Sequence, residues 1–311
     1  MNPNSSHGSF FSLTAYIHLG PLRYFVFAVL LVLYVLMLVS NALLVAVIFL
    51  NRSLHEPMFV FMCNLFGNGI FGSSIMFPFL LHQIIQDEHI VPSGFCYFQT
   101  FSIHVYGIVE YFTLSVMSYD RYLAICAPLY YNSQMTRNKM VAMSVIPWLY
   151  GCFICLIMII LSSSQRLCGN AIHKVYCDNF PIIKLACSDT STINAYGFVI
   201  SMVNIFSPLL LILVTYLRIL RVCFSGSVQT RRKALTTCMP HLTSLLNFGI
   251  GAAFEIIQYR FNMTYMPEYV RIFVSLYFLL VQPLLDPFVY GLNISKIRIL
   301  CKSLFVPTMM L

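Results

Sequence analysis

The chain has 311 residues, of which 59% are apolar and only 9% are charged, with a formal net charge of +8. A typical soluble domain carries about 25% charged residues, so this composition excludes an ordinary soluble protein and indicates an outer surface that faces lipid. An aromatic content of 15% excludes a disordered chain. No run of Lys and Arg resembles a nucleic-acid-binding patch, so we expect no nucleic acid partner. The sequence predicts a polytopic membrane protein in contact with membrane lipid.

Seven stretches are long and apolar enough to cross a bilayer as helices. A transmembrane helix needs about 20 apolar residues, whereas a strand of a lipid-facing barrel would alternate over about ten. Residues 25–50 are apolar on all sides, which favours helices. In chain order the predicted spans are Leu22 to Leu50, Pro57 to Ile85, Cys96 to Ile125, Met140 to Leu161, Asn194 to Val222, Ala234 to Tyr259 and Tyr269 to Gly291. We therefore predict an all-α seven-transmembrane helix bundle over residues 22–291.

Basic residues orient this bundle, because cytoplasmic loops hold the excess of Lys and Arg. About twelve of the 18 fall on one side, namely Arg52, Arg121, Arg137, Lys139, Arg218, Arg221, Arg231, Arg232, Lys233, Lys296, Arg298 and Lys302. The N-terminal tail, residues 1–21, is then extracellular, and Asn4 in it begins an Asn-Ser-Ser glycosylation acceptor. The C-terminal tail, residues 292–311, is cytoplasmic and is expected to contain a short amphipathic helix. We expect no removed signal peptide, because no basic segment with a cleavage site precedes the first span.

Four cysteines lie on the predicted outer face. Cys96 begins the third span, and the loop of residues 162–193 holds Cys168, Cys177 and Cys187. In an oxidising compartment four cysteines favour two disulfides, and their spacing leaves three connectivities open. A connection of about thirty residues is unusual and is commonly functional. We find no internal repeat in the sequence, which argues against a transporter assembled from duplicated halves.

Ionisable side chains inside a span are costly and are therefore functional candidates. Glu110 lies within the third span and Asp286 within the seventh, at depths where they could share a polar interior with Asn41 and Asn64. Such a group is either a hydrogen-bonded packing cluster or a cation site made of oxygen ligands. The sequence leaves both alternatives open.

The inner end of the third span carries Asp120-Arg121-Tyr122, where the arginine can reach the interface while the neighbouring carboxylate holds it. At the inner end of the third of seven helices, this tripeptide strongly indicates a functional motif. The last span contains Pro283 and Pro287. Because a proline removes a helical hydrogen bond and kinks the helix, we expect a hinge in this span.

Four segments carry a family resemblance, namely residues 54–59, 117–126, 233–241 and 283–290. Their order and spacing resemble those of the olfactory receptors, a family of rhodopsin-like G-protein-coupled receptors, over nearly the whole chain. The loop around Cys177 and Cys187 looks like the fish-like, class I branch of the family. The resemblance implies a multi-pass plasma-membrane receptor of sensory cilia that binds a small-molecule odorant. It also implies activation of a heterotrimeric G protein of the stimulatory olfactory type, which raises cyclic AMP.

The resemblance assigns roles to single residues as well. It implies the disulfides Cys96 to Cys177 and Cys168 to Cys187, which tie the long loop over the bundle as a lid. It implies roles in activation and G-protein coupling for Asp120, Arg121, Tyr122, Tyr216, Lys233, His241, Pro287 and Tyr290. The second span has Asn68-Gly69 where most members have an acidic residue, so Glu110 is the only retained sodium ligand. We therefore expect no metal and no cofactor.

The architecture of the family places the ligand between the outer halves of the third, fifth, sixth and seventh spans, beneath the long loop. His104 lies seventeen residues before Arg121, about 25 Å along the helix axis and hence in the outer half. The predicted pocket contains His104, Ile108, Tyr111, Ile200, Asn204, Ala252, Ile256, Arg260 and Leu276. This set has apolar walls and few polar anchors, as small-molecule sites do.

The polar anchor of the ligand has two interpretations. Arg260, at the outer end of the sixth span, either reaches the lipid headgroups or points inward, where a guanidinium binds a carboxylate. The class I resemblance favours the inward position, so we expect an acid or another small polar, water-soluble odorant. Glu255 lies five residues earlier, about 140° around the helix, and we expect it not to share the face of Arg260. If Glu255 lined the pocket instead, an amine would be favoured.

The sequence contains no nucleophile elbow, no metal-spaced His and Cys set inside the bundle and no phosphate-binding glycine loop, so we predict no enzymatic activity. Two other functions stay open. A peptide agonist acting below micromolar concentration would favour a different rhodopsin-like receptor, for a peptide or a lipid. Ligand-independent currents would favour a seven-helix channel or transporter, although the sequence lacks the polar stripe that would line a pore.

Overall fold

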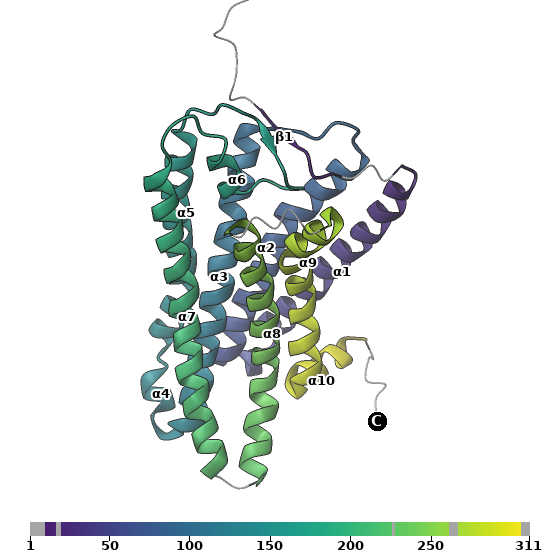
Figure 1. Cartoon of the computed structure of the whole chain (residues 1–311). Coiled ribbons are helices and arrows are strands. Elements are labelled where there is room, and N and C mark those ends of the chain that lie inside the picture. The colour runs from purple at the N-terminus through teal and green to yellow at the C-terminus, as the bar shows by residue number, and fades with distance from the viewer. Residues whose placement is uncertain (1–9, 17–19, 226–227, 261–266, 306–311) are drawn as a thin grey trace, which may run out of the picture.

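The computed structural model describes residues 10–16, 20–225, 228–260 and 267–305, and within them seven long helices form a bundle (Figure 1). Their bounds are α1 Leu22–Leu50, α2 Pro57–Ile85, α3 Ser93–Cys126, α5 Arg137–Ser163, α7 Ser191–Ser225, α8 Val228–Arg260 and α9 Glu268–Asn293. All ends but one lie within three residues of the predicted spans. The exception is α8, which begins six residues before the expected Ala234, because its first turns are polar and continue the helix beyond the apolar stretch.

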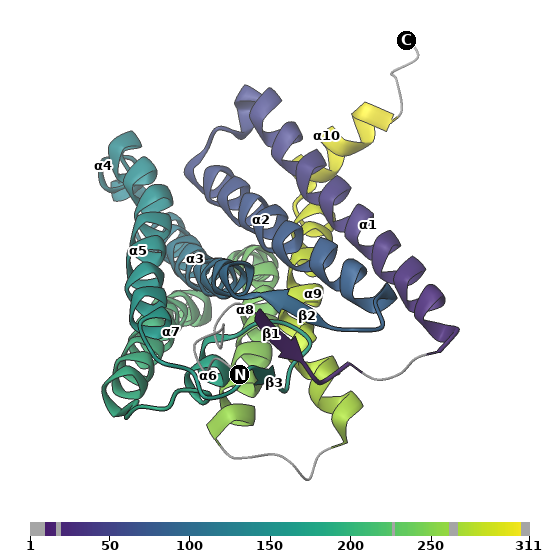
Figure 2. The ribbon, with the colours of Figure 1, turned by 90° about the horizontal axis from the view of Figure 1, so that it is seen from above.

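By length and composition alone, four helices in the described part of the chain qualify as membrane spans, namely α1, α2, α5 and α7. The less apolar α3 stands at the centre of the bundle, where it packs against α2, α5, α7 and α8 (Figure 2). A helix that is surrounded by protein needs no apolar surface toward lipid, so its polar content does not exclude it from the membrane.

Three short strands cover the outer end of the bundle. They are β1 Phe10–Leu13, β2 Ile90–Pro92 and β3 Ala171–Ile172, with β1 in the middle, antiparallel to β2 and parallel to β3. Phe11 and Leu13 are buried while Phe10 is exposed, which is the alternation of a strand with one covered face. Part of the predicted N-terminal tail is therefore folded onto the long loop between α5 and α7.

This long loop is tied down by two disulfides, Cys96–Cys177 and Cys168–Cys187, the pairs that the family resemblance implies. The loop also contains β3 and the short helix α6 Asn179–Ile183. Cys96 lies in the first turn of α3, so its bond to Cys177 holds the residues that follow Cys177 above α3. The loop consequently lies over the outer ends of the helices (Figure 2).

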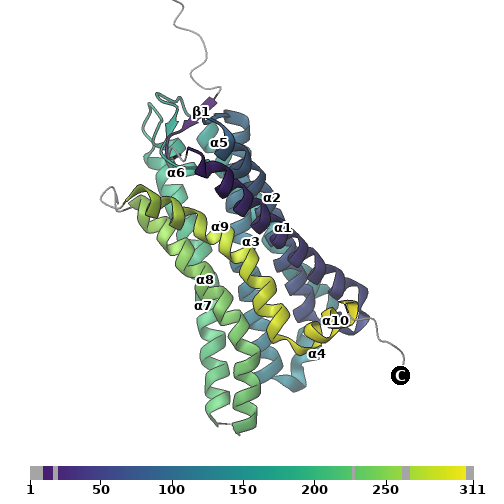
Figure 3. The same cartoon turned by 90° about the vertical axis from the view of Figure 1, so that its right-hand side faces the viewer.

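The inner end carries four shorter elements, η1 Arg52–Leu54, η2 Pro128–Tyr130, α4 Tyr131–Gln134 and α10 Ser295–Phe305. The last of them, α10, leaves the end of α9 and turns toward α1 (Figure 3). Ile297 in α10 is fully buried, whereas Ile299 is 64% exposed and Lys296 reaches Glu56, with 2.8 Å between Nζ and Oε1. These environments are those of the amphipathic helix that the sequence predicts.

Candidate ligand-binding site

A cavity of about 270 Å³ lies in the outer half of the bundle, between α3, α5, α7 and α8 and beneath the long loop. Tyr111 and Phe248 are the innermost lining residues of α3 and α8. Their rings meet edge to face, with 4.8 Å between the ring centroids. The predicted pocket residues that line the cavity are His104, Ile108, Tyr111, Ile200, Asn204 and Ala252.

The remaining predicted pocket residues have other positions. Leu276 is not among the described lining residues and packs against the apolar core instead. The reason is that α9 packs against α1, α2 and α8, so this side of α9 meets its neighbours and not the cavity. The side chains of Ile256 and Arg260 lie outside the described residues, as does Asn4, the predicted glycosylation acceptor.

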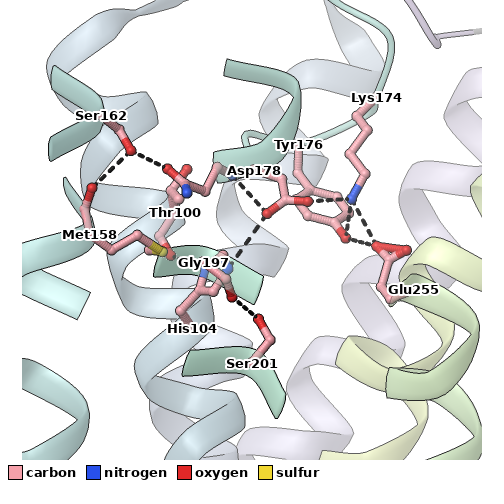
Figure 4. A network of polar contacts seen from close by, with 11 residues as sticks. Thr100, His104, Met158, Ser162, Lys174, Tyr176, Asp178, Gly197, Ser201 and Glu255 are labelled. Carbon is pink, nitrogen blue, oxygen red and sulfur yellow. Dashed lines mark hydrogen bonds and ion pairs between the residues drawn. The ribbon is translucent and has the colours of Figure 1, made fainter. Parts of the chain in front are cut away.

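Charged side chains converge at the outer end of the cavity (Figure 4). Lys174 Nζ, from the long loop, lies 2.8 Å from Glu255 Oε1 and 3.0 Å from Asp178 Oδ2. It also donates to the Tyr176 hydroxyl at 2.9 Å, and this hydroxyl in turn donates to Glu255. His104 Nε2 lies 3.8 Å from Asp178 Oδ1. These contacts join the loop to α3 on one side and to α8 on the other.

The loop residues have shifted pKa values. The pKa of the Asp178 carboxyl lies below its ordinary value. Burial alone would raise this pKa, but it is outweighed by the charges of Lys174 and His104 and by hydrogen bonds from Lys174 and the Asn179 N–H. Burial, together with the negative charges of Glu255 and Asp178, raises the pKa of the Tyr176 hydroxyl well above its ordinary value. At neutral pH Asp178 is therefore an anion and Tyr176 a neutral donor.

Glu255 is buried and lines the cavity. This is the position for which the sequence analysis expects an amine to be favoured. Lys174, Tyr176 and Asp178 were not predicted as site residues. A signal for Asp178 was present in the sequence, because it follows Cys177, whose disulfide to Cys96 places it above α3.

Comparison with known proteins identifies the family. The sequence pattern of the olfactory receptors matches residues 30–307. This chain belongs to the olfactory receptor family. Among its relatives, human Olfactory receptor 10A3 is 32% identical over 93% of this receptor and 91% of its own chain. Human Olfactory receptor 6N1 is also 32% identical, over 95% of this receptor and 94% of its own chain.

Another relative and a solved structure complete the comparison. Human Olfactory receptor 52B2 is 31% identical over 86% of this receptor and 83% of its own chain. The crystal structure of squid rhodopsin matches with a TM-score of 0.74 and 16% identity, over 92% of this receptor and 81% of that chain. The receptor thus has the rhodopsin-like fold, and as an olfactory receptor it is a multi-pass plasma-membrane protein that senses small odorant molecules and signals through a G protein.

At the inner end of α3 the receptor holds Arg121 against its neighbour Asp120. Arg121 Nε donates to Asp120 Oδ2 at 3.0 Å, and a second guanidinium nitrogen contacts the same oxygen. The other oxygen, Oδ1, accepts a hydrogen bond from the Tyr131 hydroxyl at 2.7 Å. Because Tyr131 begins α4, the second inner loop takes part in holding this pair.

Other predicted activation residues lie around this pair. Tyr122 accepts a hydrogen bond from Arg218 at 3.1 Å, and the Tyr290 hydroxyl lies 3.2 Å from His241 Nδ1. The buried Tyr216 hydroxyl has no hydrogen-bond partner among the described residues. Pro287 lies inside α9, one turn before Tyr290, and the side chain of Lys233 lies outside the described residues.

A buried polar cluster lies between the cavity and the inner end. Glu110 accepts hydrogen bonds from Asn68 at 2.8 Å and from Gln282 at 3.1 Å, and Gln282 also donates to Asp286 at 3.0 Å. Ser244 donates to Asp286 at 2.6 Å. Within the described part of the receptor, no group of three or more His, Cys, Asp and Glu side chains is placed to hold a metal ion. Hydrogen bonds through Gln282 thus join Glu110 of α3 to Asp286 of α9.

The two asparagines expected in this interior have other partners. Asn41 donates to the Pro283 carbonyl oxygen at 2.8 Å. Asn64 accepts from the Trp148 indole at 2.7 Å and donates to Thr113 at 3.2 Å. The expectation that Asn64 joins Glu110 and Asp286 is wrong, because its side chain faces α5, where Trp148 lies.

Proposed function

We propose that the cavity is the odorant-binding site and that the receptor activates a stimulatory G protein of the olfactory type, which raises cyclic AMP in sensory cilia. One observation supports the assignment of the cavity as the binding site. A mainly apolar cavity with a few polar groups, including His104 and Asn204, lies beneath a loop held by two disulfides. Mainly apolar cavities with a few polar groups are the usual form of small-molecule sites, and about 270 Å³ suits a small ligand.

Activation is proposed to be a population shift, in which the odorant binds one of two conformations more tightly. In the structure Arg121 is held by Asp120. We propose that activation releases Arg121 and rearranges it with Tyr216 and Tyr290 as α8 moves outward at its inner end. Lys233, with its basic neighbours Arg231 and Arg232 in the first turns of α8, is proposed to contact the G protein.

The binding site is tested by filling the cavity. Gly107 lines the cavity and a Cβ added there would have no atom within 4 Å, so the Gly107→Leu side chain would enter the ligand space. Cells expressing this variant are expected to lose the cyclic AMP response to any odorant found active in a screen of small acids, amines, alcohols and aldehydes. Gly67→Leu is the matched control, because Gly67 also has open space at its Cβ but does not line the cavity.

A full response of Gly107→Leu would contradict the binding site. Coupling is tested separately with Arg121→Ala, which is expected to keep surface expression and lose the cyclic AMP response. A normal response from Arg121→Ala would contradict the role given to this residue.

A further inference from the structure

Four ionisable side chains meet at the outer end of the cavity, namely the carboxylates of Asp178 and Glu255, the ammonium of Lys174 and the imidazole of His104 (Figure 4). The two carboxylates and the ammonium together carry one net negative charge. The side chains of Lys174, Glu255 and Asp178 are 4%, 11% and 15% exposed, so water screens this charge weakly. A surplus negative charge in a weakly screened site favours a cationic ligand and disfavours an anion.

Lys174 is poorly placed to bind an anionic ligand. An ammonium has three N–H donors, and Lys174 Nζ already contacts three acceptors, on Tyr176, Asp178 and Glu255, at 2.8–3.0 Å. An anion would have to replace one of these contacts. A carboxylate, by contrast, has two oxygens and accepts from several donors at once.

The side of this group that faces the cavity is acidic. Among the residues that the structure describes, the lining includes Asp178, Glu255 and His104 but not Lys174. A ligand in the cavity is therefore bordered by Asp178 and Glu255, and not by Lys174.

We propose that the receptor is selective for small amines, whose ammonium group binds Glu255 and Asp178 while the apolar part of the molecule lies inward against Ile108 and Phe248. This assignment rests on the proposed odorant site. Lys174 is the internal counter-ion of the site, and it competes with the ammonium of the ligand for Glu255. It therefore determines how tightly an amine binds, while an acid is repelled by the same carboxylates.

Thermal stabilisation of the purified receptor tests this assignment without a G protein. The probes are 2-phenylethylamine, 2-phenylethanol and phenylacetic acid, which share a ring and differ in the polar group. The amine is expected to raise the melting temperature, and the acid is not. Glu255→Gln keeps the size of the side chain and removes its charge, and it is expected to weaken amine binding at least about tenfold. Glu88→Gln makes the same change at an exposed carboxylate between α2 and β2 and is expected to leave binding unchanged.

Two further variants complete the test. Lys174→Met removes the competing ammonium and is expected to strengthen amine binding. Asp178→Asn removes the second carboxylate charge and is expected to weaken amine binding, so the assignment stays testable if Glu255→Gln does not fold. The melting temperature of each variant without a probe shows whether it folds.

Amine binding that weakens in Glu255→Gln and not in Glu88→Gln supports the assignment. If the amine binds without a rise in cyclic AMP in cells, the proposed coupling fails and the ligand class stands. The assignment is overturned if the acid or the alcohol binds and the amine does not, if none of the three probes binds, or if Glu255→Gln binds the amine as the unaltered receptor does. Acid binding that disappears in Lys174→Met would make the lysine an anion anchor and would also overturn it.

Discussion

Replacing Tyr131 with phenylalanine is expected to raise the basal activity of the receptor. The Tyr131 hydroxyl donates to the fully buried Asp120 at 2.7 Å, and Asp120 in turn holds Arg121. A hydrogen bond to a charged group contributes about 1.5–3 kcal/mol. If activation releases Arg121 and breaks this contact, Tyr131→Phe removes about 1.5 kcal/mol from the inactive conformation only. That change raises the ratio of active to inactive receptor roughly tenfold.

The assay measures the cyclic AMP level of cells without odorant, normalised to the amount of receptor at the cell surface. Tyr130→Phe is the matched control, because Tyr130 is the adjacent tyrosine, is 65% exposed, and its hydroxyl bonds no described residue. We expect a basal signal several-fold higher in Tyr131→Phe than in Tyr130→Phe. Equal signals would refute the reasoning, because the Tyr131 contact would then be equally strong in both conformations.

Two further predictions concern stability. At Gly72 an added Cβ would lie 2.5 Å from the ring of the buried Tyr106, so Gly72→Ala is expected to destabilise the purified receptor by about 1–3 kcal/mol and lower its melting temperature. Gly67 has open space at its Cβ, so Gly67→Ala is expected to keep or raise the melting temperature, since alanine favours a helix by about 0.5–1 kcal/mol over glycine. Equal melting temperatures for the two variants would contradict the close packing of α2 on α3. Because the pKa of Asp178 is lowered from 3.8, the stability contributed by its charge is present above that value and is lost as pH falls further. The difference in melting temperature between the unaltered receptor and Asp178→Asn is therefore expected to persist from about pH 7 to about pH 5 and to shrink below about pH 4, and a difference that shrinks already above about pH 5 would contradict it.

The spans and the disulfides illustrate how far the sequence alone reaches. Hydropathy reports which residues meet lipid, so it predicts α1 and α2 to the residue. It misses the start of α8, because the first turns of this helix are polar. Spacing of Cys96, Cys168, Cys177 and Cys187 leaves three pairings, and only the family resemblance selects one. Long-range pairing depends on the path of the loop, which local sequence does not determine.

Glu255 shows why the polar end of the site could not be predicted from helical geometry. The angle between Glu255 and Arg260 follows from their spacing, but the rotation of α8 about its axis does not. That rotation is determined by packing, because Phe248 meets Tyr111 at 4.8 Å between ring centroids and Ser244 bonds Asp286. Lys174, the partner of Glu255, lies 81 residues away in sequence, in a loop whose position depends on two disulfides.

One face of α8 carries contacts from the cavity to the inner end. The residues on it are spaced by three or four positions, as one face of a helix requires, and are His241, Ser244, Phe248, Ala252 and Glu255. Glu255 bonds the loop, Ala252 lines the cavity, Phe248 packs on Tyr111, and Ser244 and His241 bond residues of α9. A ligand that changes the contacts of Glu255 therefore acts on the same rigid helix that contacts Tyr290 at the inner end. Since neighbouring contacts on one helix break together, substitutions along this face are expected to be non-additive in their effect on the two conformations.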